Sequence, residues 1–150
     1  MIGQKKLKNT LIAITLLLAA RTGFAEGFYV AAGYDFRPGS SDVSLGYQKK
    51  YMAVEVNVFN MGKEEPTTKP GVENSLNVLA FVPSLPIFFK AGLVTGSSNK
   101  HGYNFGAGAD FALNASLAIR CQVTHFKVTE DLVGASESEN IASVGLKYQF

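Results

Sequence analysis

The sequence predicts an all-β protein: an eight-stranded antiparallel up-and-down transmembrane β-barrel. Three observations favour this fold class. After residue 25 there is no apolar run of about 18 residues, the length that a membrane-spanning helix needs. Apolar residues recur instead at every second position, in segments of roughly ten residues. The connections between the segments alternate between short turns and longer polar loops, as they do in transmembrane barrels.

The first 25 residues are expected to be a cleaved signal peptide, and residues 26–150 the outer-membrane barrel domain. Three lysines stand within residues 5–8, residues 11–20 are apolar, and Gly23 and Ala25 supply the small residues of a cleavage site. Loss of this segment leaves 10 Lys and Arg against 12 Asp and Glu, a net charge of −2. Because the basic character of the chain belongs to the signal, we expect no nucleic-acid partner.

Four alternating segments make up the first half of the predicted barrel. In each, apolar residues alternate with small or polar ones, the period of a strand with one apolar face. The segments are Gly27–Phe36, with Phe28 and Tyr34 on the apolar face; Ser41–Gln48, with Val43 and Leu45; Met52–Met61, with Val54 and Val56; and Ser75–Val82, with Leu76 and Val78. Polar loops are expected at 37–42 and 62–74, and a tight turn at 49–51.

Four further segments complete the predicted barrel. They are Ile87–Thr95, with Phe89 and Leu93 on the apolar face; Tyr103–Leu113, with Phe105 and Ala107; Ser116–Phe126, with Ile119 and Val123; and Asn140–Phe150, with Val144 and Leu146. Tight turns are expected at 83–86 and 114–115, and polar loops at 96–102 and 127–139. An even number of strands places both ends of the barrel domain on the side of the short turns, which is the periplasmic side in such barrels.

Alternation alone leaves open which face meets water. A soluble secreted barrel such as a lipocalin has apolar residues inside, whereas a membrane barrel has them outside. Here the second face is rich in small residues, among them Gly46, Gly92 and Gly106, where a surface in bulk water would carry more Lys and Glu. Small residues suit the lumen of a narrow barrel. The pattern therefore favours a membrane barrel over a soluble one.

Six charged residues on the second face are balanced in sign. Unpaired charge inside a protein is costly, so a lumen requires such pairing whereas water does not. We expect these residues to form a lumen charge network, with Arg120 paired to Glu55 or Asp110 and Lys90 paired to the remaining acid. The six are Asp35, Glu55, Lys90, Asp110, Arg120 and Lys147.

The last segment alternates to its end, and its final residue is aromatic. Tyr148 and Phe150 share the apolar face, which places them where barrels carry an aromatic girdle. This ending resembles the C-terminal signal that outer-membrane barrels present to their insertion machinery. We therefore expect Tyr148 and Phe150 to act as the insertion signal.

Several segments together resemble the OmpA-like β-barrel family. The paired segments Val43–Gln48 and Met52–Asn57 resemble a strand pair of that family, with a Glu in its second strand, and Pro83–Gly92 resembles its proline turn and aromatic strand. Gly106–Phe111 and Asn114–Arg120 resemble its Gly-x-Gly-x-acid-aromatic strand, tight turn and Arg-bearing strand. The resemblance covers most of residues 27–150.

The resemblance implies a lumen in which an acid–base cluster gates a small pore. Glu55, Lys90, Asp110 and Arg120 match the residue types of that cluster at corresponding strand positions. The sequence departs from the best-known member in its shorter loops and in lacking both Trp and a peptidoglycan-binding domain. Anchoring to the cell wall is therefore not implied.

The sequence gives little support for a catalytic function or a metal site. The small outer-membrane barrel enzymes that deacylate lipid A use a His-x-Ser pair, in which His removes the serine proton. Here Phe126 and Lys127 follow His125, so the serine is missing. His101, His125 and the single cysteine, Cys121, do not have the spacing of a zinc site. We expect no catalytic residues, no metal and no cofactor.

The sequence thus predicts a non-enzymatic, monomeric protein of the outer membrane of a Gram-negative bacterium, with a structural role and at most a small pore. The expected partners are outer-membrane lipids and lipopolysaccharide, with the insertion machinery and periplasmic chaperones during biogenesis. Two alternatives remain. One is a surface adhesin that binds a host factor through the longer loops, since loops on a rigid barrel often carry binding. The other is a lipid A-modifying hydrolase.

Overall fold

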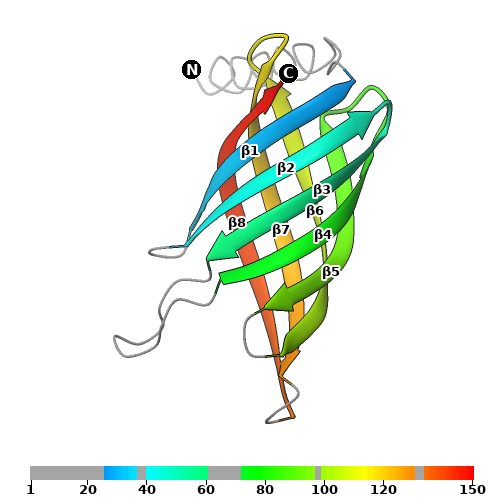
Figure 1. Ribbon diagram of the computed structural model, residues 1–150. Coiled ribbons are helices and arrows are strands. Elements are labelled where there is room, and N and C mark those ends of the chain that lie inside the picture. Colours follow the sequence, from blue (N-terminus) through cyan, green and yellow to red (C-terminus); the bar gives the residue numbers. More distant parts are fainter. Residues whose placement is uncertain (1–25, 37–39, 61–71, 97–98, 131–133) are drawn as a thin grey trace, which may run out of the picture.

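The protein is described here from a computed structural model, which covers residues 26–36, 40–60, 72–96, 99–130 and 134–150. The expected signal peptide, residues 1–25, lies outside these ranges. Eight antiparallel strands form one closed barrel in chain order (Figure 1). They are β1 (Gly27–Asp35), β2 (Ser41–Lys49), β3 (Met52–Asn60), β4 (Val72–Phe81), β5 (Ile87–Gly96), β6 (Lys100–Ala112), β7 (Leu117–Glu130) and β8 (Ala135–Gln149). The predicted eight-stranded antiparallel fold is confirmed.

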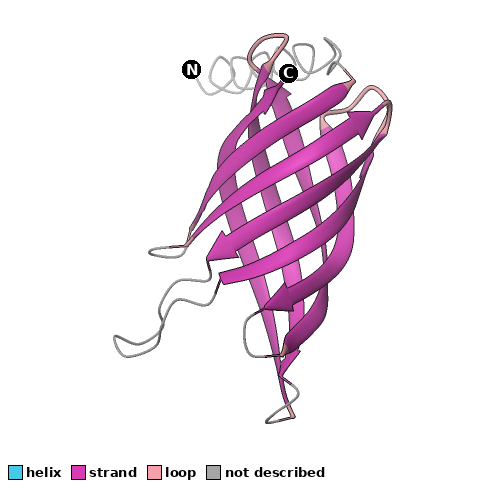
Figure 2. Cartoon of the chain, viewed as in Figure 1, coloured by secondary structure: helices cyan, strands magenta, loops and turns pink. Residues whose placement is uncertain are grey.

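Each strand pairs with its neighbours in the chain, and β1 pairs with β8 to close the barrel. The closing ladder runs from Tyr29 opposite Gln149 to Asp35 opposite Ser143. The strands run obliquely around the barrel and the described part contains strands, turns and no helix (Figure 2). No helix among the described residues is long and apolar enough to cross a membrane.

The short turns lie at the rim where β1 begins and β8 ends, which we call the terminal rim. Residues 50–51, 82–86 and 113–116 connect strands there. The two-residue turn after β2 is possible because Lys50 adopts a left-handed conformation, with φ 52°. The other connections lie at the opposite rim, the loop rim, and most of their residues fall outside the described ranges.

Three predicted loops are partly strand. β4 begins at Val72 and β6 at Lys100, and most of the predicted loop 127–139 belongs to an extended hairpin of β7 and β8. The prediction was wrong there because the outward side chains become polar, as at Lys127 and Ser138. The apolar alternation therefore stops while backbone pairing continues to Glu130 opposite Ala135. The hairpin extends beyond β1, whose ladder with β8 ends at Ser143.

The apolar residues face outward and the polar and small residues face the lumen. Val56, Leu93 and Leu146 are 50–68% exposed, whereas Glu55, Arg120 and Lys147 are buried. The predicted facing of these residues is confirmed. The outward face therefore presents a continuous apolar surface between the rims. The exposed apolar residues on it include Phe28, Val43, Leu45, Val54, Val58, Leu76, Val78, Phe89, Phe105, Val123 and Val144.

Candidate functional site

The barrel lumen near the terminal rim contains a cluster of four charged side chains. Glu55 comes from β3, Asp110 from β6, Arg120 from β7 and Lys147 from β8. The ladder between β6 and β7 places Asp110 directly opposite Arg120. The four residues are buried to at least 96%, and their two carboxylates balance their two cations. Among the predicted network residues, these four lie together.

Arg120 holds the cluster together through both carboxylates. Its Nε and Nη2 donate to Asp110 Oδ1 and Oδ2 at 2.7 and 2.9 Å, and its Nη1 donates to Glu55 Oε2 at 2.6 Å. This two-point contact with Asp110 uses the fork geometry that distinguishes Arg from Lys. Lys147 Nζ donates to Asp110 Oδ2 at 3.2 Å and to Gln48 Oε1 at 2.7 Å. Arg120 was expected to pair with Glu55 or Asp110, and it contacts both.

Two buried aromatic rings enclose the cluster. Arg120 Cζ lies 4.8 Å from the ring centroid of Phe88 and 5.3 Å from that of Tyr29. Tyr29 Oη also donates to Glu55 Oε2 at 2.8 Å. The rings fit because glycines face them: a Cβ at Gly46 would collide with the Tyr29 ring, and one at Gly108 with the Phe88 ring. The cluster is thus shielded from water and fixed in geometry.

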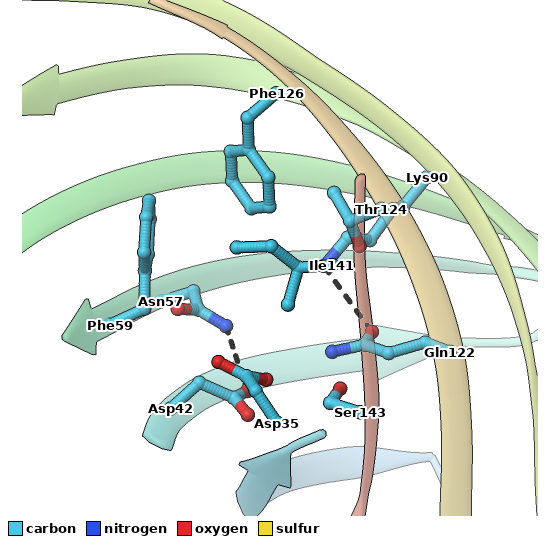
Figure 3. A pocket seen from close by; sticks show the side chains of 10 residues that line it. All are labelled: Asp35, Asp42, Asn57, Phe59, Lys90, Gln122, Thr124, Phe126, Ile141 and Ser143. Carbon is cyan, nitrogen blue, oxygen red and sulfur yellow. Dashed lines mark hydrogen bonds between the residues drawn. The ribbon is translucent and has the colours of Figure 1, made fainter. Parts of the chain in front are cut away.

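A second polar layer lies nearer the loop rim and surrounds a small cavity (Figure 3). Lys90 Nζ donates to Gln122 Oε1 at 3.3 Å, and Asn57 Nδ2 donates to Asp42 Oδ2 at 3.2 Å. Asp35 accepts a hydrogen bond from Ser40 Oγ. The cavity volume is about 20 Å³, which is room for about one water molecule.

The expected pairing of Lys90 with a network acid was wrong. No carboxylate among the described residues forms a salt bridge with Lys90, which bonds to the amide of Gln122. The reason is that Arg120 already occupies Glu55 and Asp110, and Lys90 lies in the next layer along the lumen.

Above this layer, at the loop rim, the lumen is filled by apolar side chains. Phe59 and Phe126 pack with their ring centroids 4.9 Å apart. The members of this apolar layer are Phe59, Val94, Phe126, Val128 and Ile141. The described lumen therefore has charged, polar and apolar layers in sequence along the barrel axis, with the small cavity in the polar layer.

Sequence reasoning missed the aromatic and amide parts of the site. Tyr29 and Phe88 occupy inward positions that strand parity already indicated, since their neighbours at 28 and 89 belong to the predicted apolar faces. They were missed because only small and charged residues were assigned to the inward face. Gln48 and Asp42 were missed in the same way, although both alternate with outward residues of β2.

The remaining predicted residues lie on the outward face. Tyr148 and Phe150 are 47% and 72% exposed, with ring centroids 5.3 Å apart, and Phe150 N donates to Phe28 O at 3.0 Å. His125 lies against Phe105, with ring centroids 4.9 Å apart. The described residues contain no group of three His, Cys, Asp or Glu side chains that could hold a metal ion.

An apolar exterior around a closely packed polar lumen defines the transmembrane class of β-barrel, since a soluble barrel has the reverse arrangement. No protein-family model matches the sequence, and no curated protein matches it either. Solved structures do match.

The structure is similar to the N-terminal β-barrel domain of Pseudomonas aeruginosa OprF, with a TM-score of 0.66, 14% sequence identity, and coverage of 85% of this chain and 100% of that one. Neisserial surface protein A gives a TM-score of 0.56 and 15% identity, covering 83% of this chain and 97% of that one. Yersinia pestis outer membrane protein Ail gives a TM-score of 0.51 and 13% identity, covering 84% of this chain and 100% of that one. The chain therefore has the eight-stranded fold of small outer-membrane barrels, which is the fold that the OmpA-like resemblance implied.

Proposed function

We propose that this protein is a non-enzymatic, monomeric barrel of the outer membrane of a Gram-negative bacterium, with a structural role and a lumen closed to bulk flow. One observation carries the proposal: the apolar surface is on the outside, and charged, polar and apolar side chains occupy the described lumen around a small cavity. An exposed apolar surface of this extent requires lipid around it. The short turns at the terminal rim support a periplasmic position for both ends of the barrel domain.

The three layers of the lumen support its closure. The charge cluster joins β3, β6, β7 and β8 across the interior, and the apolar layer blocks the loop rim. The cavity between them holds about one water molecule. Ion passage would require breaking the contacts of Arg120 with two carboxylates, so any conductance should be small and intermittent.

The first test is the behaviour of residues 26–150 in membranes. We expect the protein to stay in the membrane fraction, to need detergent for extraction and to run at different positions on a gel with and without boiling, because a closed barrel resists detergent until heated. Purified barrel in a planar bilayer should give no stable, wide conductance. A protein that is soluble without detergent would overturn the proposal, and a steady wide pore would overturn the closed lumen.

A second candidate function is binding at the cell surface through the β7–β8 hairpin. The hairpin extends past β1, and its exposed side chains include Ser136, Glu137 and Ser138. Because Lys127 faces Ser138 in the ladder, replacing residues 128–137 with Asn-Gly should shorten the hairpin to a tight turn. Loss of adhesion to host cells with normal heat-modifiable mobility would favour this function. Unchanged adhesion would remove it.

A further inference from the structure

The outward face of β6, β7 and β8 carries a shallow apolar groove with a volume of about 410 Å³. It exists because small side chains occupy outward positions there, at Ala107, Ala109, Cys121 and Ala142. Elsewhere those positions carry larger residues, such as Leu45, Val56 and Leu93. Phe36 forms one wall of the groove; it is 74% exposed, and its backbone N–H donates to Ala142 O at 3.0 Å.

Polar and aromatic rows follow the groove toward the loop rim. Ala107, Val123 and Ala142 face one another across the three strands and form the last apolar row. The next row along the strands is Phe105, His125 and Asn140, and the row after it is Tyr103, Lys127 and Ser138. Successive outward residues on a strand are about 7 Å apart, so Lys127 stands roughly 14 Å beyond the apolar row. The surface changes from apolar to cationic over the length of a lipid headgroup.

At pH 7, with His neutral, the charge of these rows is the positive charge of Lys127. His125 and Lys127 are outward, and His101 lies in the row beyond them, opposite Thr129. Among the described residues, the outward positions of β6, β7 and β8 carry no carboxylate. Glu137 and Glu139 pair across the ladder with Val128 and Phe126, whose side chains are buried in the lumen, so they belong to the opposite face.

Polar and aromatic neighbours surround His125 and Lys127 in these rows. His125 Nδ1 is hydrogen-bonded to Asn140 Oδ1 at 2.8 Å, and the imidazole packs against the Phe105 ring. The side chain of Lys127 is exposed, so its ammonium is available to a ligand. Tyr103 and Ser138 flank Lys127 and add hydroxyl groups. Such a set recognises a phosphate group together with the polar part of a headgroup.

We propose that this surface binds a lipid with a phosphate-bearing headgroup, one acyl chain lying in the groove and the phosphate at Lys127. The proposal rests on the proposed function, because only a barrel in a membrane exposes this face to lipid. The charge complementarity selects a lipid over a second copy of this chain, whose own outward rows are also cationic. The chemistry fits lipid A, which carries both phosphates and several acyl chains.

The test uses the absence of Trp from the chain, since a single introduced Trp then reports on its own surroundings. In Phe105→Trp the reporter lies beside His125, and in Val58→Trp it lies on β3, on another part of the outward face. Both variants are placed in vesicles of brominated phosphatidylcholine, whose bromine quenches Trp fluorescence. Unbrominated lipid A is then added as the probe.

We expect lipid A to relieve quenching in Phe105→Trp more than its mole fraction predicts, with an apparent preference of about fivefold for one cation at a membrane surface. The preference should be absent in Val58→Trp. In the Phe105→Trp background, Lys127→Ala should remove it, Lys127→Arg should retain it, and Ala142→Leu, which fills the groove, should reduce it.

Three outcomes would overturn the lipid site. They are equal relief in the two reporters, a preference that survives Lys127→Ala, and oxidative crosslinking of Cys121 between copies, which would show that a second barrel covers the groove. In each of these, quenching in Val58→Trp still reports a barrel within the bilayer, so the membrane part of the proposed function stands. The Cys121 crosslink would in addition overturn its monomeric state. If neither reporter is quenched in any vesicle, the barrel is not in the membrane and both proposals fail.

Discussion

At the scale of single residues, the cluster around Arg120 shows how a narrow barrel tolerates buried charge. Each ionised group has an oppositely charged partner within hydrogen-bonding distance, and Tyr29 supplies a further donor to Glu55. Removing one member leaves its partners charged and dry, which costs far more than an exposed ion pair is worth. The cluster therefore behaves as a unit, and its members cannot be assessed singly.

Arg120→Ala should lower the free energy of unfolding by about 3–5 kcal/mol, because Glu55 and Asp110 would remain buried without their main partner. The double variant Arg120→Ala with Glu55→Ala should lose less free energy of unfolding than the two single variants lose together, because removing Glu55 also removes one of the charges left unpaired. Urea unfolding in detergent or lipid gives the three values, with Lys49→Ala at the exposed end of β2 as the baseline variant. Additive losses would mean that the two side chains do not interact.

The same residues show what the alternation of side chains along a strand can and cannot predict. Alternation is enough to place Glu55, Asp110 and Arg120 on the inward face, because a strand sends successive side chains to opposite sides. It does not determine which cation reaches which acid, since that depends on the stagger between strands around the barrel. Lys90 was misassigned for this reason: one layer along the lumen is enough to separate it from Glu55.

At the scale of strands, the outward alternation has an energetic role that depends on depth. Val56 lies near the middle of β3 and is 50% exposed on the outward face, whereas Ser41 begins β2 at the loop rim. Charge on the outward face is expensive at the centre of a bilayer and inexpensive near its surface.

Val56→Arg should therefore lower the free energy of unfolding in lipid by about 2–4 kcal/mol, and Ser41→Arg by about 0–1 kcal/mol. Both variants add the same side chain, so the difference isolates depth. Reversible unfolding in vesicles provides the measurement. Equal effects at the two positions would contradict a membrane around the barrel and would favour a soluble one.

Strand ends were harder to predict than strand centres. The apolar pattern marks only the part of a strand that faces lipid, so β7 and β8 appeared to end where their outward residues become polar. The backbone ladder continues because hydrogen bonding does not depend on side-chain polarity, and Val128 still packs inward against the apolar layer. A search for alternation of inward residues alone, such as Thr124, Phe126 and Val128, could have found this extension.

At the scale of the whole molecule, assembly depends on β8, which completes the barrel. Phe150 is 72% exposed at the terminal rim and its backbone bonds to β1, while its ring packs edge-on against Tyr148. An exposed aromatic pair at this position fits recognition by insertion machinery before the barrel closes. This role for Tyr148 and Phe150 remains a prediction.

Deletion of Phe150 should lower the amount of folded protein in the outer membrane at high expression, because insertion becomes slow relative to degradation. Heat-modifiable mobility of membrane fractions measures the folded amount. Leu113→Ala, which also removes an exposed apolar side chain at the terminal rim, is the matched control and should change little. Equal levels for the wild type and the deletion would contradict the role of Phe150.

The ladder between β1 and β8 also has a kinetic consequence. Seven of the eight ladders join strands that are consecutive in the chain, whereas the eighth joins residue 29 to residue 149. Pairing consecutive strands closes short loops, but this last pairing must restrict the whole chain at once. Folding rates fall as contacts become more distant in sequence. Ring closure is therefore expected to be the slow step of folding. Until it occurs, the exposed edges of β1 and β8 are the places where two unfinished molecules would join.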